Sequence, residues 1–176
     1  MDNRDSIGNH NLILPGGLHW TAAGRGIVHE EVPAQTGKTV HSLQIFVDLG
    51  REKRDMAPFA LSLQPQDVPV VQSSGVKVRV PLGSYGGARS PLTPPTEVDM
   101  LDISLADGAE LTIPIAEDHG AFVLPIFGTV AVGEQSFDPE GLKLPVYSAE
   151  ATPQSITLRA PQGAARMTLF SGRPFR

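Results

Sequence analysis

Short segments in which apolar and polar residues alternate recur about every ten residues along most of this chain. Alternation with a period of two is the pattern of a β-strand that has one buried face. In the segment 75–80, Val76, Val78 and Val80 are predicted to face a core, while the residues between them face solvent. The segments with this pattern are residues 41–49, 75–80, 100–105, 110–115, 155–159 and 166–170.

One longer apolar stretch, residues 121–132, leaves two interpretations open. It is either one long strand bent at Pro125 or Gly128, or two shorter strands. No segment shows a 3.6-residue period over three turns, which a helix with one buried face would show. Strands at this spacing, joined by turns that draw on 18 glycines and 16 prolines, predict an all-β sandwich or barrel.

Composition excludes several classes of protein. The chain has no cysteine, so disulfides and thiolate metal sites are excluded. A formal net charge of −5 argues against a general nucleic-acid binder, which needs clustered Lys and Arg. No apolar stretch approaches the roughly 20 residues of a membrane-spanning helix, and the first dozen residues hold no secretory signal. We therefore expect a cytoplasmic protein that binds neither nucleic acid nor membrane.

The segment 27–32 carries the chemistry that stands out. Gly24 and Gly26 permit a tight backbone turn before it, and the segment itself is predicted to be a short strand. His29 and Glu31 would then project from the same face, with backbones about 7 Å apart, and Glu30 from the other face. Such a pair either binds one metal ion or forms a weak exposed ion pair. Two ligands are fewer than the two histidines and one carboxylate typical of a non-haem iron site.

Four other histidines are candidates for completing such a site. His19 is expected to be a packed or surface residue, and His41 opens a predicted strand that can face the same barrel. His10 and His119 lie in turn-like polar stretches and are expected to be solvated. None of these placements completes such a site within one chain.

Residues 5–9 and 17–31 resemble the second half of the metal-binding motif of the pirin family. The segment 41–49 resembles the strand that follows this motif, and residues 90–91, 99–105, 108–109 and 169–174 resemble features of the second domain of that family. The resemblance implies two cupin barrels, each a double-stranded β-helix or jelly roll. We expect residues 5–66 to form a residual N-terminal cupin and residues 70–176 an incomplete C-terminal cupin.

The resemblance also implies a metal centre, usually iron, held by three histidines and one glutamate. His29 and Glu31 match the last two of these ligands. The other two come from an earlier His-x-His motif, and only residues 1–4 precede the matched region, so the chain is expected to be truncated at both ends with half of the metal site missing. The cofactor expected is Fe(II) or another divalent first-row metal, bound weakly or not at all.

Two functions follow from the resemblance and stay open. One is a quercetin 2,3-dioxygenase-type oxidoreductase, in which Glu31 is the general base toward a flavonol-like substrate. The other is a non-catalytic cupin that acts as a regulatory, protein-binding module or is a remnant of a pirin. A protein partner or a second copy would cover the open barrel edge, and His10, His19 or His41 of that copy would complete the metal site. A nuclear location is the alternative in a eukaryote.

Overall fold

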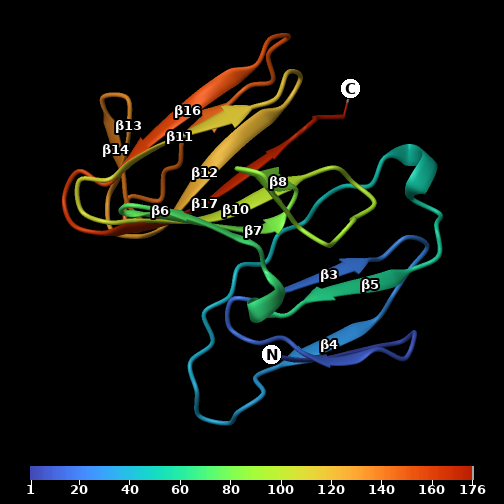
Figure 1. The fold of residues 1–176 in the computed structure, drawn as a ribbon. Coiled ribbons are helices and arrows are strands. Elements are labelled where there is room, and N and C mark those ends of the chain that lie inside the picture. Colours follow the sequence, from blue (N-terminus) through green and yellow to red (C-terminus); the bar gives the residue numbers. More distant parts are fainter. Residues whose placement is uncertain (176) are drawn as a thin grey trace. The chain divides into compact units, whose positions relative to one another are not determined.

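A computed structural model describes residues 1–175 of the chain (Figure 1). It divides into two compact units, which we describe separately. Unit 1 consists of Met1–Val68 together with Leu92–Thr96, and unit 2 of Pro69–Pro91 together with the chain from Glu97 onward. The regular structure of these residues is β-strand apart from two single-turn 3-10 helices, η1 (Arg51–Lys53) and η2 (Pro65–Asp67). The predicted all-β fold class is therefore confirmed. Within residues 1–175 no helix has the length and apolarity to span a membrane.

Unit 2 is built from two antiparallel sheets and a small hairpin (Figure 1). The larger sheet has the strand order β15-β12-β17-β10-β7-β6, and the smaller one β11-β16-β13-β14. The strands of unit 2 are β6 (Val70–Ser73), β7 (Val76–Leu82), β8 (Ser84–Tyr85), β9 (Ala88–Arg89), β10 (Asp99–Leu105), β11 (Glu110–Ile115), β12 (Gly120–Phe127), β13 (Val130–Val132), β14 (Gln135–Phe137), β15 (Val146–Tyr147), β16 (Gln154–Arg159) and β17 (Ala165–Gly172).

The core of unit 2 is made by the inward residues of alternating strands. In β7 the predicted alternation holds, since Val78 and Val80 are buried while Lys77 is exposed. Inward residues of β10, β11, β12, β13, β16 and β17, with Ala160 after β16, complete one continuous apolar cluster. Its buried members are Val78, Val80, Leu101, Ile103, Leu105, Ile113, Ile115, Ala121, Val123, Val130, Ile156, Leu158, Ala160, Ala165, Met167 and Leu169.

The stretch 121–132 forms two strands, which decides between the two interpretations. β12 pairs with β17 in the larger sheet, and β13 pairs with β16 in the smaller one. The chain changes sheet at Gly128, which has a φ of +68° and packs close to the backbone of Ala164. A side chain there would overlap the Ala164 carbonyl, so the turn that closes this corner requires glycine.

A buried carboxylate stabilises the outer face of the larger sheet. Asp102 accepts two hydrogen bonds from Arg166, from Nε to Oδ1 at 2.9 Å and from Nη2 to Oδ2 at 2.8 Å. Arg79 Nη1 donates a third, to Oδ2, at 3.1 Å. Burial by itself would raise the pKa of Asp102, but the hydrogen bonds and positive charges of Arg166 and Arg79 lower it below its ordinary value.

Unit 1 contains two small antiparallel sheets. One has the strand order β2-β1-β4, and the other consists of β3 and β5. The strands are β1 (Asp2–Asp5), β2 (His10–Leu12), β3 (Leu18–Ala22), β4 (His29–Val32) and β5 (Phe59–Leu63).

The strand predicted over residues 41–49 is wrong, because the structure places this segment in an irregular conformation. A strand needs a neighbour for its backbone N–H and C=O groups, and among residues 1–175 no strand pairs with this segment. Its apolar side chains consequently reach solvent, with Leu43 42%, Ile45 40% and Phe46 89% exposed. Alternation alone therefore indicated a strand that unit 1 does not form.

Candidate metal centre

The candidate site begins with the turn that joins β1 to β2. Asp5 Oδ1 accepts hydrogen bonds from the backbone N–H groups of Ile7 and Asn9, at 3.1 and 2.9 Å, and Asn9 Nδ2 donates to Asp5 Oδ2 at 2.8 Å. Slight burial would raise the pKa of Asp5, but the hydrogen bonds from Asn9 and Ile7 lower it below its ordinary value. An aspartate that closes its own turn in this way fixes where β1 ends and β2 begins.

Antiparallel pairing then places β4 beside β1, with Asp5 opposite His29 and Asn3 opposite Glu31. Directly opposite residues in such a pair project from the same face of the sheet. His29 and Glu31 therefore share the face of Asn3, while Glu30 lies on the other face, as the two-residue period predicted.

A second tight turn sets the path of the chain into β4. Gly24 and Gly26 both have positive φ, +51° and +132°, on either side of Arg25. The backbone N–H of Arg25 donates to the carbonyl of Met56 at 3.0 Å, and a Cβ on Gly24 would overlap that same carbonyl. The two glycines thus have the backbone role that the sequence predicted for them.

His29 and Glu31 face each other across a short gap. Nδ1 of His29 lies 3.9 Å from Oε1 of Glu31, and the two side chains are 37% and 32% exposed. Two donors at right angles on one first-row ion stand about 3 Å apart, because each lies about 2.1 Å from the ion. A small side-chain rotation would bring this pair to that spacing. Among residues 1–175, however, no group of three or more His, Asp or Glu side chains is arranged to hold a metal ion.

His19 is the third titratable side chain of this region. It projects from β3, opposite Ser62 of β5, and its Nδ1 lies 3.0 Å from Ser62 Oγ. Nε2 lies 3.1 Å from Thr21 Oγ1. Burial lowers the pKa of His19, the charge of Glu31 raises it and that of His29 lowers it, and the net result is a lowered pKa. The structure thus couples His19 electrostatically to the His29–Glu31 pair, with both ring nitrogens already engaged.

Asn3 is a residue of this site that sequence reasoning missed. It is fully buried and lies opposite both Glu31 on β4 and Asn11 on β2. Its Nδ2 donates to Asn11 Oδ1 at 3.1 Å, but its Oδ1 has no hydrogen-bond partner among the described residues. A buried carbonyl oxygen of this kind fits a site that receives a polar ligand or an ion. Only the register of β1 against β4 reveals this placement.

The other histidines lie away from the pair. His10 is exposed, with Nε2 2.7 Å from Asp2 Oδ1, and the register of β1 and β2 puts both on the opposite face of the sheet. His41 is exposed in the irregular segment. His119, in unit 2, is only 5% exposed, and its Nδ1 has no partner among the described residues, so the prediction that it is solvated is wrong. It follows a turn in which the backbone N–H of Asp118 donates to Glu150 O.

Comparison with known proteins identifies the class to which this fold belongs. A sequence model of the pirin family matches residues 1–47. Pirin of Mus musculus is 33% identical over 143 residues, which cover 79% of this chain and 49% of that protein. A putative quercetin 2,3-dioxygenase of Pseudomonas aeruginosa is 29% identical over 182 residues, covering 99% of this chain and 62% of that protein.

A similar solved structure shows the same fold. The crystal structure of a quercetin 2,3-dioxygenase from Acinetobacter baumannii superposes with a TM-score of 0.86 at 26% identity, covering 99% of this chain and 56% of that one. The fold is therefore the all-β cupin fold. The chain is similar in sequence to pirins, and in sequence and structure to quercetin 2,3-dioxygenases. The chain spans 49% and 62% of the lengths of the two curated relatives compared above.

Proposed function

We propose that this chain is a metal-binding cupin of the quercetin 2,3-dioxygenase type, with His29 and Glu31 as its metal ligands. The observation that carries the proposal is that these two side chains face each other, 3.9 Å apart, in the part of the chain that the pirin family model matches. Imidazole nitrogen and carboxylate oxygen suit Fe(II) and other divalent first-row metals. The residues present fit half of such a site, since the buried Asn3 Oδ1 beside them has no other partner among the described residues.

Each of these residues would have a separate role. When bound, the metal ion supplies a Lewis acid and a redox-active centre. Glu31 is the general base that accepts the hydroxyl proton of a flavonol-like substrate, because its carboxylate is partly exposed on the open side of β4. His19 is a positioning residue, since its ring is held by Ser62 and Thr21, and the Glu31 charge partly offsets the lowering of its pKa by burial. Two protein ligands leave most positions of the ion to water, so we expect weak binding.

A metal titration tests the proposal directly. Co(II), and Fe(II) without oxygen, are titrated into the protein by calorimetry, with elemental analysis of the purified protein alongside. His29→Ala and Glu31→Gln should each weaken binding at least about tenfold, because even an indirect partner of a metal ligand contributes that much. The matched control is His10→Ala, a histidine on the same sheet but on its opposite face.

Equal affinity in all four proteins would refute the assignment of the ligands. If metal binds as expected, quercetin turnover is measured next. Glu31→Gln should abolish turnover, and full turnover in that variant would refute its role as general base.

A second function is favoured by the exposed apolar side chains of the irregular segment. Val40, Leu43, Ile45 and Phe46 are all at least 40% exposed in the described structure. In this alternative the chain is a non-catalytic protein-binding module, and a protein partner or a second copy covers this segment. Sedimentation of the wild type and of Phe46→Ser tests whether a second copy covers this segment. A dimer that uses this segment should dissociate in the variant.

We also propose the division into a residual N-terminal cupin over residues 5–66 and a C-terminal cupin over 70–176, which the boundary between Val68 and Pro69 supports, although residues 92–96 group with unit 1. A cytoplasmic location, or a nuclear one in a eukaryote, remains part of the proposal. Fractionation of cells that express the chain tests it.

A further inference from the structure

Unit 2 has a cavity of about 610 Å³ that is partly open to solvent, at one end of its interior. This volume lies in the range of about 300–1,000 Å³ typical of sites for small organic ligands. The cavity is independent of the proposed metal ligands, which belong to unit 1. The residues that line it are Ser84, Tyr85, Gly86, Gly87, Ala88, Arg89, Asp99, Leu101, Ile113, Pro114, Ile115, Leu169 and Ser171.

The floor of the cavity is apolar because it continues the core. Leu101 of β10 and Leu169 of β17 are paired in register and buried, and Ile113 and Ile115 of β11 are buried as well. Each of these four side chains belongs to the core cluster of unit 2. A ligand in the cavity would therefore place an apolar body against them.

One inward position of β10 departs from this apolar pattern. Residues 101, 103 and 105 of β10 face the core, so the two-residue period also turns Asp99 inward, at the end where the cavity lies. Its register partner on β17 is Ser171, which is buried. The interior of unit 2 thus ends in a carboxylate and a hydroxyl.

Asp99 has hydrogen bonds but no positive partner. Ser171 Oγ donates to its Oδ2, and the backbone N–H of Ser84 donates to its Oδ1, both at 3.3 Å. No Lys, Arg or His nitrogen in residues 1–175 forms an ion pair with it. A carboxylate offers about four acceptor positions, so two long hydrogen bonds leave it able to accept more.

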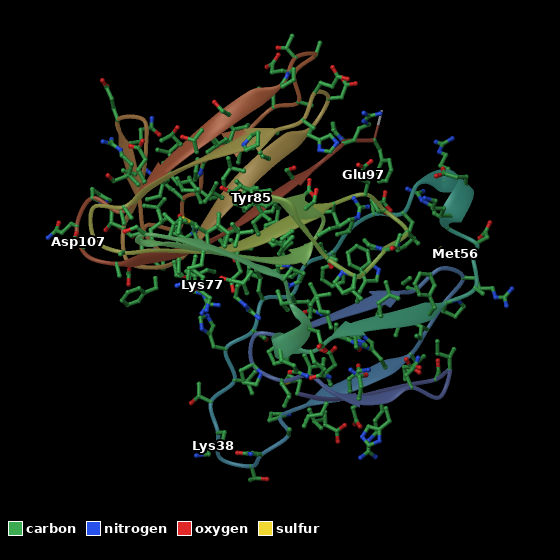
Figure 2. All side chains as sticks on the ribbon, in the orientation of Figure 1. Lys38, Met56, Lys77, Tyr85, Glu97 and Asp107 are labelled. Atoms are coloured by element: carbon green, nitrogen blue, oxygen red, sulfur yellow. The ribbon has the colours of Figure 1, made fainter. Side chains whose placement is uncertain are left out.

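The hairpin of β8 and β9 closes one side of the cavity. Tyr85, labelled in Figure 2, is paired with Ala88. Both residues pack on the core cluster. Ser84 is paired with Arg89 on the other face of the hairpin, and Arg89, which is exposed and lines the rim of the cavity, forms no ion pair with Asp99. The aromatic ring of Tyr85 therefore forms a wall near the carboxylate.

We propose that this cavity binds a small organic cation, a primary amine with a compact apolar or aromatic body. The ammonium group donates hydrogen bonds to Asp99, and the apolar body packs on Leu101, Ile113 and Leu169. A carboxylate at the edge of an apolar cavity favours a cation, because the cation compensates a negative charge that has no positively charged partner in the protein. An anion of the same shape is repelled.

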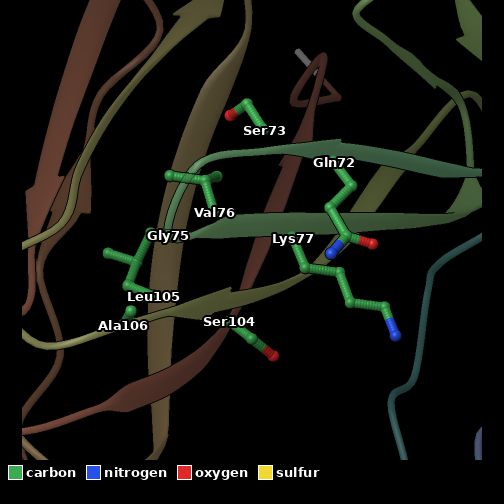
Figure 3. A pocket seen from close by; sticks show the side chains of 8 residues that line it. All are labelled: Gln72, Ser73, Gly75, Val76, Lys77, Ser104, Leu105 and Ala106. Atoms are coloured by element: carbon green, nitrogen blue, oxygen red, sulfur yellow. The ribbon is translucent and has the colours of Figure 1, made fainter.

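A second hollow of unit 2 lacks these features. It has a volume of about 220 Å³ and lies at the opposite end of the β7–β10 pair, where Val76 is the register partner of Leu105 (Figure 3). Lys77, Gln72 and Ser104 are cross-strand neighbours on the outer face there, and their polar ends extend into solvent. This hollow is an ordinary polar surface depression.

Phenethylamine is the probe, compared with 2-phenylethanol and 3-phenylpropionate, which have similar bodies and a neutral or negative end. Each is titrated into the ¹⁵N-labelled full chain and followed by backbone amide chemical shifts. The amine should shift the amide signals of Tyr85, Ala88 and Ile113, and the shifts should saturate. Its affinity should be at least about ten times that of the alcohol, since a hydrogen bond to a charged group contributes this much. The acid should produce no saturable shift.

Three variants complete the experiment. Asp99→Asn keeps a carbonyl acceptor and should remove the preference for the amine. Glu134→Gln, the matched control, removes the same charge from an exposed turn of unit 2 outside the cavity and should change nothing. Ala88→Leu keeps Asp99 but fills part of the cavity, so it should weaken amine and alcohol alike even if Asp99→Asn perturbs the hairpin. Equal binding of amine and alcohol by the wild type, or amine binding unchanged in Asp99→Asn or Ala88→Leu, would overturn the proposal.

Discussion

Replacement of Asp102 by Ala should destabilise unit 2 by about 3 kcal/mol. Breaking a buried ion pair by removing one partner costs about 3–5 kcal/mol, because the remaining charge is left without compensation. Here the Asp102 side chain is 10% exposed and Arg79 16%, so Arg79 stays largely buried in the variant. Arg166 is 49% exposed and is solvated again once its partner is removed, which places the expected cost at the lower end of that range.

Urea denaturation followed by circular dichroism measures this loss. A change of 3 kcal/mol in a chain of this length corresponds to about 6–12 °C in melting temperature. Glu110→Gln is the control, because Glu110 and Arg159 form an ion pair of 3.9 Å with both side chains about half exposed. That variant should lose less than about 0.5 kcal/mol. A loss below about 1 kcal/mol in Asp102→Ala would refute the reasoning that this triad is a buried, compensated charge.

The same triad predicts a dependence on pH. The pKa of Asp102 is lowered in the folded state, so its contribution to stability is fully present above the ordinary carboxyl pKa of about 4. The contribution is lost as the pH falls through the lowered pKa of folded Asp102. The difference in unfolding free energy between the wild type and Asp102→Ala should therefore be constant above about pH 5 and shrink below about pH 4. A difference that grows on acidification would contradict the sign of this shift.

Two further predictions concern packing. Gly24→Ala should destabilise unit 1 by at least about 2 kcal/mol, since a Cβ at positive φ is strained and would also overlap the Met56 carbonyl. Faster hydrogen exchange of the backbone amides in β3 and β4 would report this loss. Unchanged exchange would contradict it. Leu158→Ala, at a position with 0% exposure in the core of unit 2, should cost about 2–5 kcal/mol in urea denaturation, whereas Phe46→Ala, at 89% exposure, should cost less than about 0.5 kcal/mol. Similar losses in these last two variants would show that the burial pattern is wrong.

The strands of unit 2 could be predicted from sequence because their neighbours lie within the described chain. The alternation in β7 and β10 marked the inward residues correctly, and each strand pairs with partners that bury this face. The segment 41–49 has the same alternation, but no described strand pairs with it and its prediction failed. A period of two therefore reports which face of a segment is apolar, and it does not report whether a neighbouring strand is present.

The candidate site shows the same limit. The common face of His29 and Glu31 follows from their spacing within one strand, and it was predicted. The placement of Asn3 opposite Glu31, and of His19 beside Ser62, depends on the register between strands that are far apart in sequence. Register is a property of strand pairs, so inspection of one segment cannot supply it.

The two units use their inward positions differently, and this difference connects stability to function. In unit 2 the inward positions are apolar until the end of the interior, where Asp99 and Ser171 line the cavity. In unit 1 the sheet face of the candidate site carries the buried Asn3 and the partly exposed His29 and Glu31, and among residues 1–175 the buried apolar residues of this unit are Ala22, Leu63 and Val68. Polar side chains contribute little apolar burial, so unit 1 gains less stability from its interior than unit 2 does. Such an arrangement is expected where an interior serves chemistry, because a site that binds an ion requires the polar groups that a stable core excludes.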